Sequence, residues 1–374
     1  MVKSTPYKLR TKSQYIYPSP FSAFKEPVAV TLMNVASVSF QCQQQFRLAF
    51  RQFKPSVPQY RKHQVKEEEV PSKSRQQNDH EDIKPIKRKI MQNHTARTLT
   101  HSEIKRIEDE QVRRKSLLAK VCDEAKRNRT VFRCTGKLIN VRENRFMYCN
   151  TPKVGSTSWM RVICVLTGRA KSVEELLKPK GHIDVHKVPA LKRDEKYHYP
   201  SYFSFMFVRH PFARLLSAYR SKFENVDASN LYLKQKRIDI IKRYRKNPTN
   251  HSLEAGDDVT WEEFVRSVID DNPKSFNPHY IAQHLYCGPC LFPFDFIGKL
   301  EDVAKESKYV LNRVNAPDDI VYPLQPKKTN SSNLENLHSY FSRLTKDQME
   351  NLYNIYELDF KLFGYNILIR WVIS

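Results

Sequence analysis

The stretch Phe146-Met-Tyr-Cys-Asn-Thr-Pro-Lys-Val-Gly-Ser-Thr-Ser-Trp-Met-Arg161 decides the fold of this chain. It opens with apolar and aromatic residues, which predict a buried strand over 146–149. Pro152 and Gly155 then predict a tight loop. From Ser156 onward apolar side chains recur at helical spacing, so we expect a helix to begin there. The order strand, loop, helix is typical of one unit of an α/β sheet.

The loop of this stretch carries groups that bind anions. It ends in Ser156-Thr-Ser158, where a helix start offers unpaired backbone N–H groups, hydroxyls and the positive end of the helix dipole. Together with Lys153, these groups predict a site for phosphate or sulfate. The Walker pattern Gly-x-x-x-x-Gly-Lys-Ser/Thr is absent from the stretch. For this loop taken alone, an ordinary strand–helix turn stays open as the alternative.

A second stretch repeats the order: Phe203-Ser-Phe-Met-Phe-Val-Arg-His-Pro-Phe-Ala-Arg-Leu-Leu-Ser-Ala-Tyr-Arg-Ser-Lys-Phe223. It predicts a strand with Arg209 at its end and a helix opened by Pro211, whose missing N–H would be unpaired in a first turn anyway. Ser217 lies about two helical turns beyond Arg209, so both side chains can reach one phosphate. Two such units predict an α/β fold, a parallel sheet flanked by helices, with ligands at the carboxyl ends of the strands.

Two motifs, Pro152-Lys-Val-Gly-Ser-Thr-Ser-Trp-Met-Arg161 and Arg209-x-Pro-Phe-x-Arg-Leu-Leu-Ser217, resemble the cofactor motifs of Golgi carbohydrate sulfotransferases. The most similar branch holds the chondroitin and dermatan 4-O-sulfotransferases. The resemblance runs from Phe146 to Ile367. Its further blocks are Ile240-Ile-Lys-Arg-Tyr-Arg-Lys-Asn247, Gly256-Asp-Asp-Val-x-x-Glu-Glu-Phe264, Cys287-x-Pro-Cys290, Asp295-Phe-Ile-Gly-Lys-x-Glu301 and Leu352-Tyr-x-x-Tyr-x-Leu-Asp-Phe360.

The resemblance implies a nucleotide-kinase-like sulfotransferase fold and a transfer of sulfuryl from 3′-phosphoadenosine 5′-phosphosulfate to a sugar hydroxyl. It implies that Arg209 and Ser217, with Arg214 beside them, hold the 3′-phosphate. Lys153 is implied at the bridging oxygen, where a compact cation offsets the charge growing on the leaving phosphate. The residues implied for the 5′-phosphosulfate are Pro152, Lys153, Val154, Gly155, Ser156, Thr157 and Ser158. The reaction requires no metal.

Two positions depart from the family's pattern. Ser156 stands where relatives often have cysteine, and its hydroxyl still binds anions. His210 stands where relatives usually carry Asp or Glu, a residue expected to orient its neighbours. The change at His210 puts local geometry in doubt more than activity, and it leaves open a protein that binds without turnover.

A general base is needed to take the proton of the sugar hydroxyl, and histidine suits that task near neutral pH. His186 is our first choice, because it lies between the two motifs, where related glycan sulfotransferases carry a histidine. His279 in Phe276-Asn-Pro-His-Tyr280 is the rival. Only geometry within hydrogen-bond reach decides between them.

The chain has 374 residues and a formal net charge of +24, which implies an anionic partner. Nucleic acid, an acidic membrane surface and an acidic glycan all fit that charge. No zinc finger, homeodomain or RNA-binding signature is evident, so we expect no nucleic acid. The resemblance favours a chondroitin- or dermatan-like acceptor, with terminal glucuronate or N-linked GalNAc as alternatives. The basic stretch Lys234 to Lys246 either grips an acidic polysaccharide or is a solvated helix face.

Three segments divide the chain. Residues 1–50 hold one apolar run, Val28 to Phe40, shorter than the about 20 residues that span a bilayer. The resemblance implies a type II Golgi membrane protein with a lumenal catalytic domain, so we interpret this run as a weak anchor. Residues 51–130 predict a basic stem, disordered at first and helical over His101 to Arg127 with its Lys and Arg residues in solvent. Residues 131–374 form the predicted sulfotransferase domain; the oligomeric state stays unknown.

Cysteines and glycosylation sequons bear on the compartment. Cys287-Gly-Pro-Cys290 lacks the second pair that a metal site would need, so we interpret it as structural disulfide chemistry, with the pairing left open. The sequons predict a secreted glycoprotein and begin at Asn93, Asn128, Asn250 and Asn330.

Overall fold

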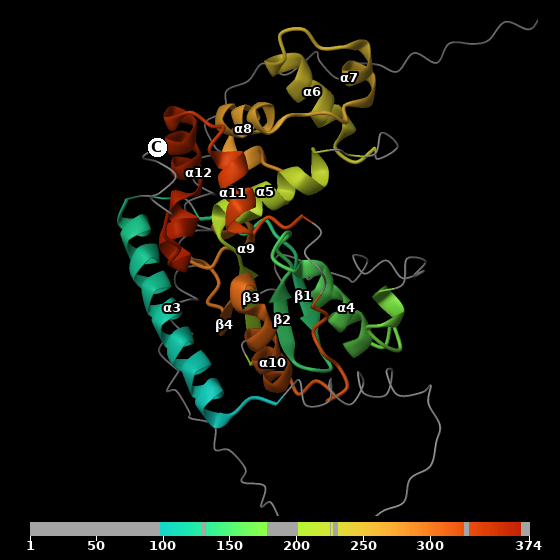
Figure 1. Ribbon diagram of the computed structural model, residues 1–374. Coiled ribbons are helices and arrows are strands. Elements are labelled where there is room, and N and C mark those ends of the chain that lie inside the picture. Colours follow the sequence, from blue (N-terminus) through green and yellow to red (C-terminus); the bar gives the residue numbers. More distant parts are fainter. Residues whose placement is uncertain are drawn as a thin grey trace, which may run out of the picture. The chain divides into compact units, whose positions relative to one another are not determined.

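A computed structural model describes residues 98–128, 130, 132–177, 201–224, 226, 231–324 and 329–367. In this part of the chain four strands form one sheet in the order β1-β2-β3-β4 (Figure 1). The strands are β1 Leu138–Val141, β2 Phe146–Cys149, β3 Phe203–Val208 and β4 Phe296–Lys299. Strands β2, β3 and β4 run parallel, whereas β1 pairs antiparallel with β2. The α/β prediction is confirmed, and the antiparallel edge strand is an addition to it.

The two predicted strand–loop–helix units are present. Helix α4 (Ser156–Leu166) follows β2, and α5 (Pro211–Lys222) follows β3 with Pro211 in its first turn. Cys149, the last residue of β2, pairs with Met206 near the end of β3. The loop after β2 and the residues after β3 therefore leave the sheet at the same end, where the carboxyl ends of these parallel strands lie.

Alternation along β3 explains why the sheet is covered on both faces. Phe205 and Phe207 pack on one side with α4 and with α10 (Val303–Arg313). Met206 and Val208 pack on the other side, in a core shared with α5 and with the helices that follow. Those further helices are α6 Lys234–Tyr244, α7 Asn250–Ala255, α8 Trp261–Asp270, α9 Gln283–Cys287, α11 Leu334–Phe341 and α12 Lys346–Phe363. Single 3₁₀ turns span Glu175–Leu177, Pro273–Ser275 and Leu300–Asp302.

Helix α3 (His101–Arg127) has the predicted bounds and packs along the edge strand β4 and helix α12 (Figure 1). The side-chain amide of Gln111 pairs with both backbone groups of Ile297, at 2.8 and 3.1 Å, which satisfies an otherwise open strand edge. The expectation that all basic residues of this helix face solvent is wrong for Arg114. That side chain is buried against Glu306 at 2.7 Å.

Both cysteines of the Cys287-x-x-Cys290 pair form disulfides, but not with each other. Cys290 bonds to Cys122 of α3, and Cys287 bonds to Cys149 at the end of β2. The predicted disulfide chemistry is confirmed, and its pairing joins segments more than a hundred residues apart in sequence.

Some predictions fall outside the described residues: the run Val28 to Phe40, the stem up to residue 97, and His186. Among the helices that are described, none combines the length and the apolar composition that crossing a membrane takes.

Candidate functional site

The loop after β2 and the start of α4 have the geometry of an anion site. Lys153 and Gly155 have φ angles of 71° and 83°, so the loop turns tightly before the helix begins. The first turn of α4 contains no acidic residue, and in the described part of the chain no side chain caps it. Its first N–H groups lack acceptors within the helix, and the positive end of the dipole lies there. Ser156 and Thr157 lie at this uncapped end.

Ser158 and Val154 hold the loop rather than line it with their side chains. Val154 is fully buried in the core between the sheet and α4. Ser158 donates its N–H to the Gly155 carbonyl at 3.0 Å and its hydroxyl to the Pro323 carbonyl at 3.0 Å. The Tyr322 hydroxyl also donates to the Gly155 carbonyl, at 3.1 Å. These bonds tie the loop to the segment before residue 325.

Lys153 lies at the centre of the site. Its ammonium group donates to the hydroxyl of Ser221, in the last turns of α5. Burial, followed by the charges of Lys222, Arg209 and Arg214, lowers the pKa of Lys153 to about 7. A lysine that loses its proton this easily gains most from an anion, because an anion restores the charged form.

Arg209 follows β3 and is 4% exposed. Its guanidinium donates to the Lys153 carbonyl at 3.3 Å and to the hydroxyls of Ser331 and Ser332 at 2.9 and 2.7 Å. Its Nε is buried and has no partner among the described residues. Burial lowers the pKa of Arg209 to about 10, partly offset by Glu301.

Hydroxyl groups surround this guanidinium. Ser217 lies 3.2 Å from the Thr329 hydroxyl, which lies 2.9 Å from the Ser331 hydroxyl. Ser331 and Thr329 therefore connect Arg209 to Ser217 in one cluster. That Arg209 and Ser217 bind one phosphate stays a prediction. A buried cation among hydroxyls matches the chemistry that binds a phosphate.

Arg214 is buried and uses its donors on backbone carbonyls. It donates to Pro152 at 3.0 Å, to Pro278 at 3.0 Å and to Ile281 at 2.6 Å. The Arg214 guanidinium thus connects Pro152, which precedes Lys153, to Pro278, which precedes His279. These contacts suit a residue that positions the loop; its predicted contact with the 3′-phosphate stays a prediction.

Hydrogen bonds from α9 hold the backbone of Arg209 in place. Gln283, at the start of α9, accepts from the Arg209 N–H and donates to the Arg209 carbonyl, both at 2.9 Å. The carboxylate of Asp359 in turn accepts from the N–H groups of Gln283 and His284, at 2.6 and 2.9 Å. Because Cys287 ends α9 and bonds to Cys149, this short helix links the ends of β2 and β3.

Among the described residues, no carboxylate pairs with three cations at the ends of β2, β3 and α5. In the described part of the chain, Lys153, Lys222 and Arg209 form no ion pair with Asp or Glu, although Glu301 lies near enough to Arg209 to affect its pKa. Burial and then Arg237 lower the pKa of Lys222. Mutual repulsion among buried cations is costly unless an anion joins them, so the arrangement is that of an anion site.

Of the two histidines proposed as base, only His279 lies within the described residues. Its backbone N–H donates to Asn277 Oδ1 at 3.0 Å, which identifies that atom as the amide oxygen, and its Nδ1 lies 2.7 Å from the same atom. In a neutral imidazole this contact favours the proton on Nδ1, the tautomer in which Nε2 carries the lone pair that a base needs.

Comparison with known proteins agrees with this geometry. The model of the Sulfotransferase family matches residues 137–366, which include every element of the site. The chain belongs to the sulfotransferase family. The predicted resemblance to carbohydrate sulfotransferases is therefore confirmed.

Named relatives of this sulfotransferase cover only part of it. Carbohydrate sulfotransferase 14 of Danio rerio is 38% identical over 224 residues, which are 60% of each chain. Carbohydrate sulfotransferase 11 of Rattus norvegicus is 34% identical over 240 residues, 62% of this chain and 67% of the relative. Carbohydrate sulfotransferase 8 of Homo sapiens is 32% identical over 235 residues, 60% of this chain and 54% of the relative. No solved structure matches the chain significantly.

His210, the departure from the family's pattern, is packed among aromatic rings. Its ring lies 5.3 Å from that of Phe360 and 5.4 Å from that of Tyr365, and its Nε2 is 3.3 Å from the Asn366 carbonyl. Burial lowers the pKa of His210. A carboxylate is nevertheless present: Glu301 accepts from the His210 N–H at 3.0 Å.

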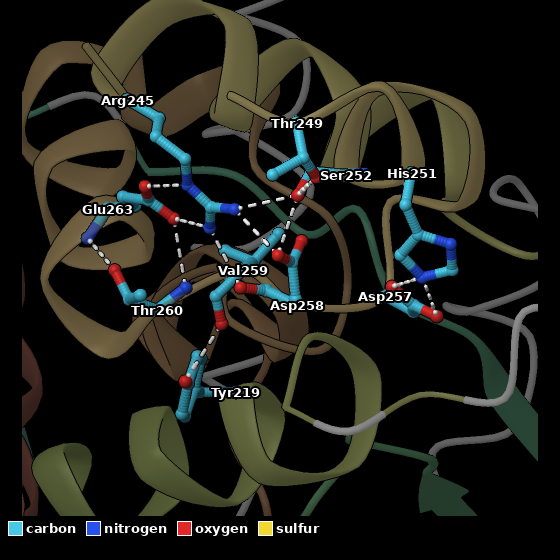
Figure 2. A network of polar contacts seen from close by, with 10 residues as sticks. All are labelled: Tyr219, Arg245, Thr249, His251, Ser252, Asp257, Asp258, Val259, Thr260 and Glu263. Carbon is cyan, nitrogen blue, oxygen red and sulfur yellow. Dashed lines mark hydrogen bonds and ion pairs between the residues drawn. The ribbon is translucent and has the colours of Figure 1, made fainter. Parts of the chain in front are cut away.

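The basic stretch Lys234 to Lys246 turns out to be largely paired. Arg237 is fully buried and donates to the carbonyls of Tyr232 and Gly256. Arg245 binds Glu263 through two nitrogens, each at 2.8 Å, and Asp258 at 2.6 Å (Figure 2). Lys236 and Arg243 pair with carboxylates at the end of α8. Most of this stretch therefore stabilises the packing of α6, α7 and α8.

Sequence reasoning missed several residues of the site. Ser221 was not singled out, although it lies four residues after Ser217, on the same helix face. The hydroxyl-rich segment Thr329-Asn-Ser-Ser332 was interpreted only as a sequon. No sequence signal indicated Gln283, because its role depends on tertiary contacts.

Proposed function

We propose that this chain is a carbohydrate O-sulfotransferase that uses 3′-phosphoadenosine 5′-phosphosulfate and acts on a chondroitin- or dermatan-like glycan. The observation that carries the proposal is the convergence of Lys153 before α4, Arg209 before α5 and Lys222 at the end of α5, none of them paired with a carboxylate in the described residues. Family membership supports the reaction class and the donor.

The residues present fit this donor. The buried Nε of Arg209, which has no partner among the described residues, and the hydroxyls of Ser217 and Ser331 suit a 3′-phosphate. The uncapped start of α4 and Lys153 suit a 5′-phosphosulfate. When bound, the donor supplies a sulfuryl group on a phosphate leaving group.

Each residue then has a defined task. Lys153 neutralises the negative charge that grows on the bridging oxygen as the S–O bond breaks. Arg209 and Ser217 fix the position of the donor, so that transfer takes place within one complex. A histidine accepts the proton of the sugar hydroxyl while its oxygen bonds to sulfur. His186 remains our first choice for this role, and the contact of His279 Nδ1 with Asn277 suits the tautomer that the role requires.

The location proposed is the Golgi lumen, behind a type II membrane anchor. Two disulfides support an oxidising compartment. Asn250, an exposed asparagine in a sequon, supports a glycoprotein. Glycosidase digestion that leaves gel mobility unchanged, together with free thiols throughout, would contradict this location.

Transfer of labelled sulfate to a panel of desulfated glycans tests the function. We expect incorporation into chondroitin and dermatan backbones. Incorporation only into a terminal glucuronate or N-linked GalNAc acceptor would keep the reaction and change the acceptor. Donor binding without incorporation into any glycan would indicate a binding protein, and the absence of donor binding would refute the proposal.

A further inference from the structure

A half-exposed aromatic residue lies beside the cations of the site. Tyr232 is 46% exposed and its neighbour Leu231 is 76% exposed. The ammonium nitrogen of Lys222 lies 4.9 Å from the centre of the Tyr232 ring. Large aromatic residues with this exposure offer an apolar face and a polar tip to a ligand.

Lys222 places this ring next to the reacting centre. It directly follows Ser221, whose hydroxyl binds the Lys153 ammonium, and its charge contributes to the lowered pKa of Lys153. The phenol oxygen of Tyr232 lies 3.4 Å from Nδ1 of His279. Arg214 holds the residues before Lys153 and before His279 to one guanidinium. The ring, the lysine and the histidine therefore belong to one neighbourhood.

The backbone of Tyr232 is fixed despite the exposure of its side chain. The fully buried Arg237 donates to the Tyr232 carbonyl at 2.7 Å and to the Gly256 carbonyl. Asn277 donates to the phenol oxygen at 3.1 Å. A ring held at both ends loses little conformational entropy when a ligand covers it, which favours its use as a binding platform.

The chemistry of the pair selects a ligand. The C–H face of a sugar ring packs on an aromatic face, and the Tyr232 ring provides one. Lys222 has no carboxylate partner among the described residues, and burial lowers its pKa, so an anion is the ligand that stabilises its charge. The two requirements meet in a sugar that carries its own carboxylate.

We propose that Tyr232 and Lys222 form the subsite for an anionic sugar of the acceptor, a uronic acid next to the hydroxyl that receives sulfate. The sugar packs on the Tyr232 ring, and its carboxylate pairs with the Lys222 ammonium. This inference rests on the proposed function and names the part of the glycan that the enzyme recognises.

Calorimetry on the whole protein, saturated with adenosine 3′,5′-bisphosphate, tests the subsite without requiring turnover. The probes are a desulfated chondroitin hexasaccharide and the same oligosaccharide with its carboxyl groups reduced to alcohols. We expect Lys222→Gln to weaken binding of the intact oligosaccharide about 10-fold, and to change binding of the reduced one less than 2-fold. Tyr232→Ala should weaken both, since it removes the platform. The matched control Lys120→Gln removes an exposed charge on α3 and should change neither.

Four results would overturn the subsite. Equal losses of affinity in Lys222→Gln for the intact and the reduced oligosaccharide would show that Lys222 recognises no carboxylate. A loss of adenosine 3′,5′-bisphosphate binding in Lys222→Gln would assign that lysine to the donor. Unchanged binding in both variants, or an equal loss in Lys242→Gln on α6, would move the glycan elsewhere. If the wild-type protein binds no bisphosphate at all, the proposed function fails instead, and binding of the two oligosaccharides alone still tests the subsite.

Discussion

Two basic regions of this molecule differ in what faces their cations. Around α6, Arg245 meets Glu263 and Asp258, and its pKa is raised, first by the hydrogen bond with Glu263 (Figure 2). At the ends of β2 and β3, Lys153 has no such partner in the described residues and its pKa is lowered. Both regions are rich in Lys and Arg in the sequence. The difference shows that unpaired charge, rather than the number of cations, marks the anion site.

The largest effect should follow the loss of Lys153. Lys153→Ala should lower turnover about 1,000-fold, the upper range for removing one group that stabilises developing charge. Affinity for adenosine 3′,5′-bisphosphate should fall much less, because leaving-group charge is greatest in the transition state. Single-turnover sulfate transfer and calorimetry measure the two quantities. Equal losses in both would place Lys153 in ground-state binding alone.

Loss of the base should cost about 100-fold or more in turnover while donor affinity is kept. If His186 is the base, His186→Ala should show this loss and lack the acidic limb of the pH profile, and His279→Ala should lose less. The reverse result would assign the base to His279.

A matched pair of arginine substitutions sharpens the comparison of the two regions. Arg209→Ala should weaken adenosine 3′,5′-bisphosphate binding about 10- to 100-fold, since hydrogen bonds to charged groups contribute about 1.5–3 kcal/mol. Arg245→Ala should leave this affinity unchanged and lower the melting temperature, because it leaves Glu263 and Asp258 without their cation.

Arg209→Lys is the control for the first of these variants, because it keeps the charge and loses the fork of donors. It should bind with intermediate affinity. If Arg245→Ala weakened the bisphosphate as much as Arg209→Ala, the division into a paired and an unpaired region would be wrong.

The local parts of this fold were predictable from the sequence. Apolar runs and the helix starts at Ser156 and Pro211 depend on neighbouring residues, so the bounds of β2, α4, β3 and α5 agree with expectation. The spacing of Arg209 and Ser217 was likewise predictable, because one loop and one helix connect the two residues.

Contacts across long sequence separations were not predictable in the same way. Ser331 and Ser332 reach Arg209 from more than 120 residues away, and Cys122 finds Cys290 across 168. The pairing of Arg245 with Glu263 also depends on how α6 packs on α8. The periodicity of apolar residues predicts which face of a helix or strand is buried. It does not predict which polar groups meet across the core.

The last predicted effect is a pH dependence of donor-site binding. Lys153 has a pKa of about 7 because burial and then its cationic neighbours disfavour the charged form. A bound phosphate favours that form, so binding should take up protons above pH 7 and weaken as pH rises from 7 to 9. The limit is about tenfold in Kd per pH unit for one proton. Phosphate groups do not produce this trend, since their second ionisation, near pH 6, is largely complete above pH 7.

Calorimetry with adenosine 3′,5′-bisphosphate in buffers of different ionisation enthalpy counts the protons. Lys153→Arg should abolish the uptake, because arginine stays charged throughout this range. A wild-type affinity that is constant from pH 7 to 9 would mean that Lys153 is already fully charged, and that its neighbours are screened from it in solution.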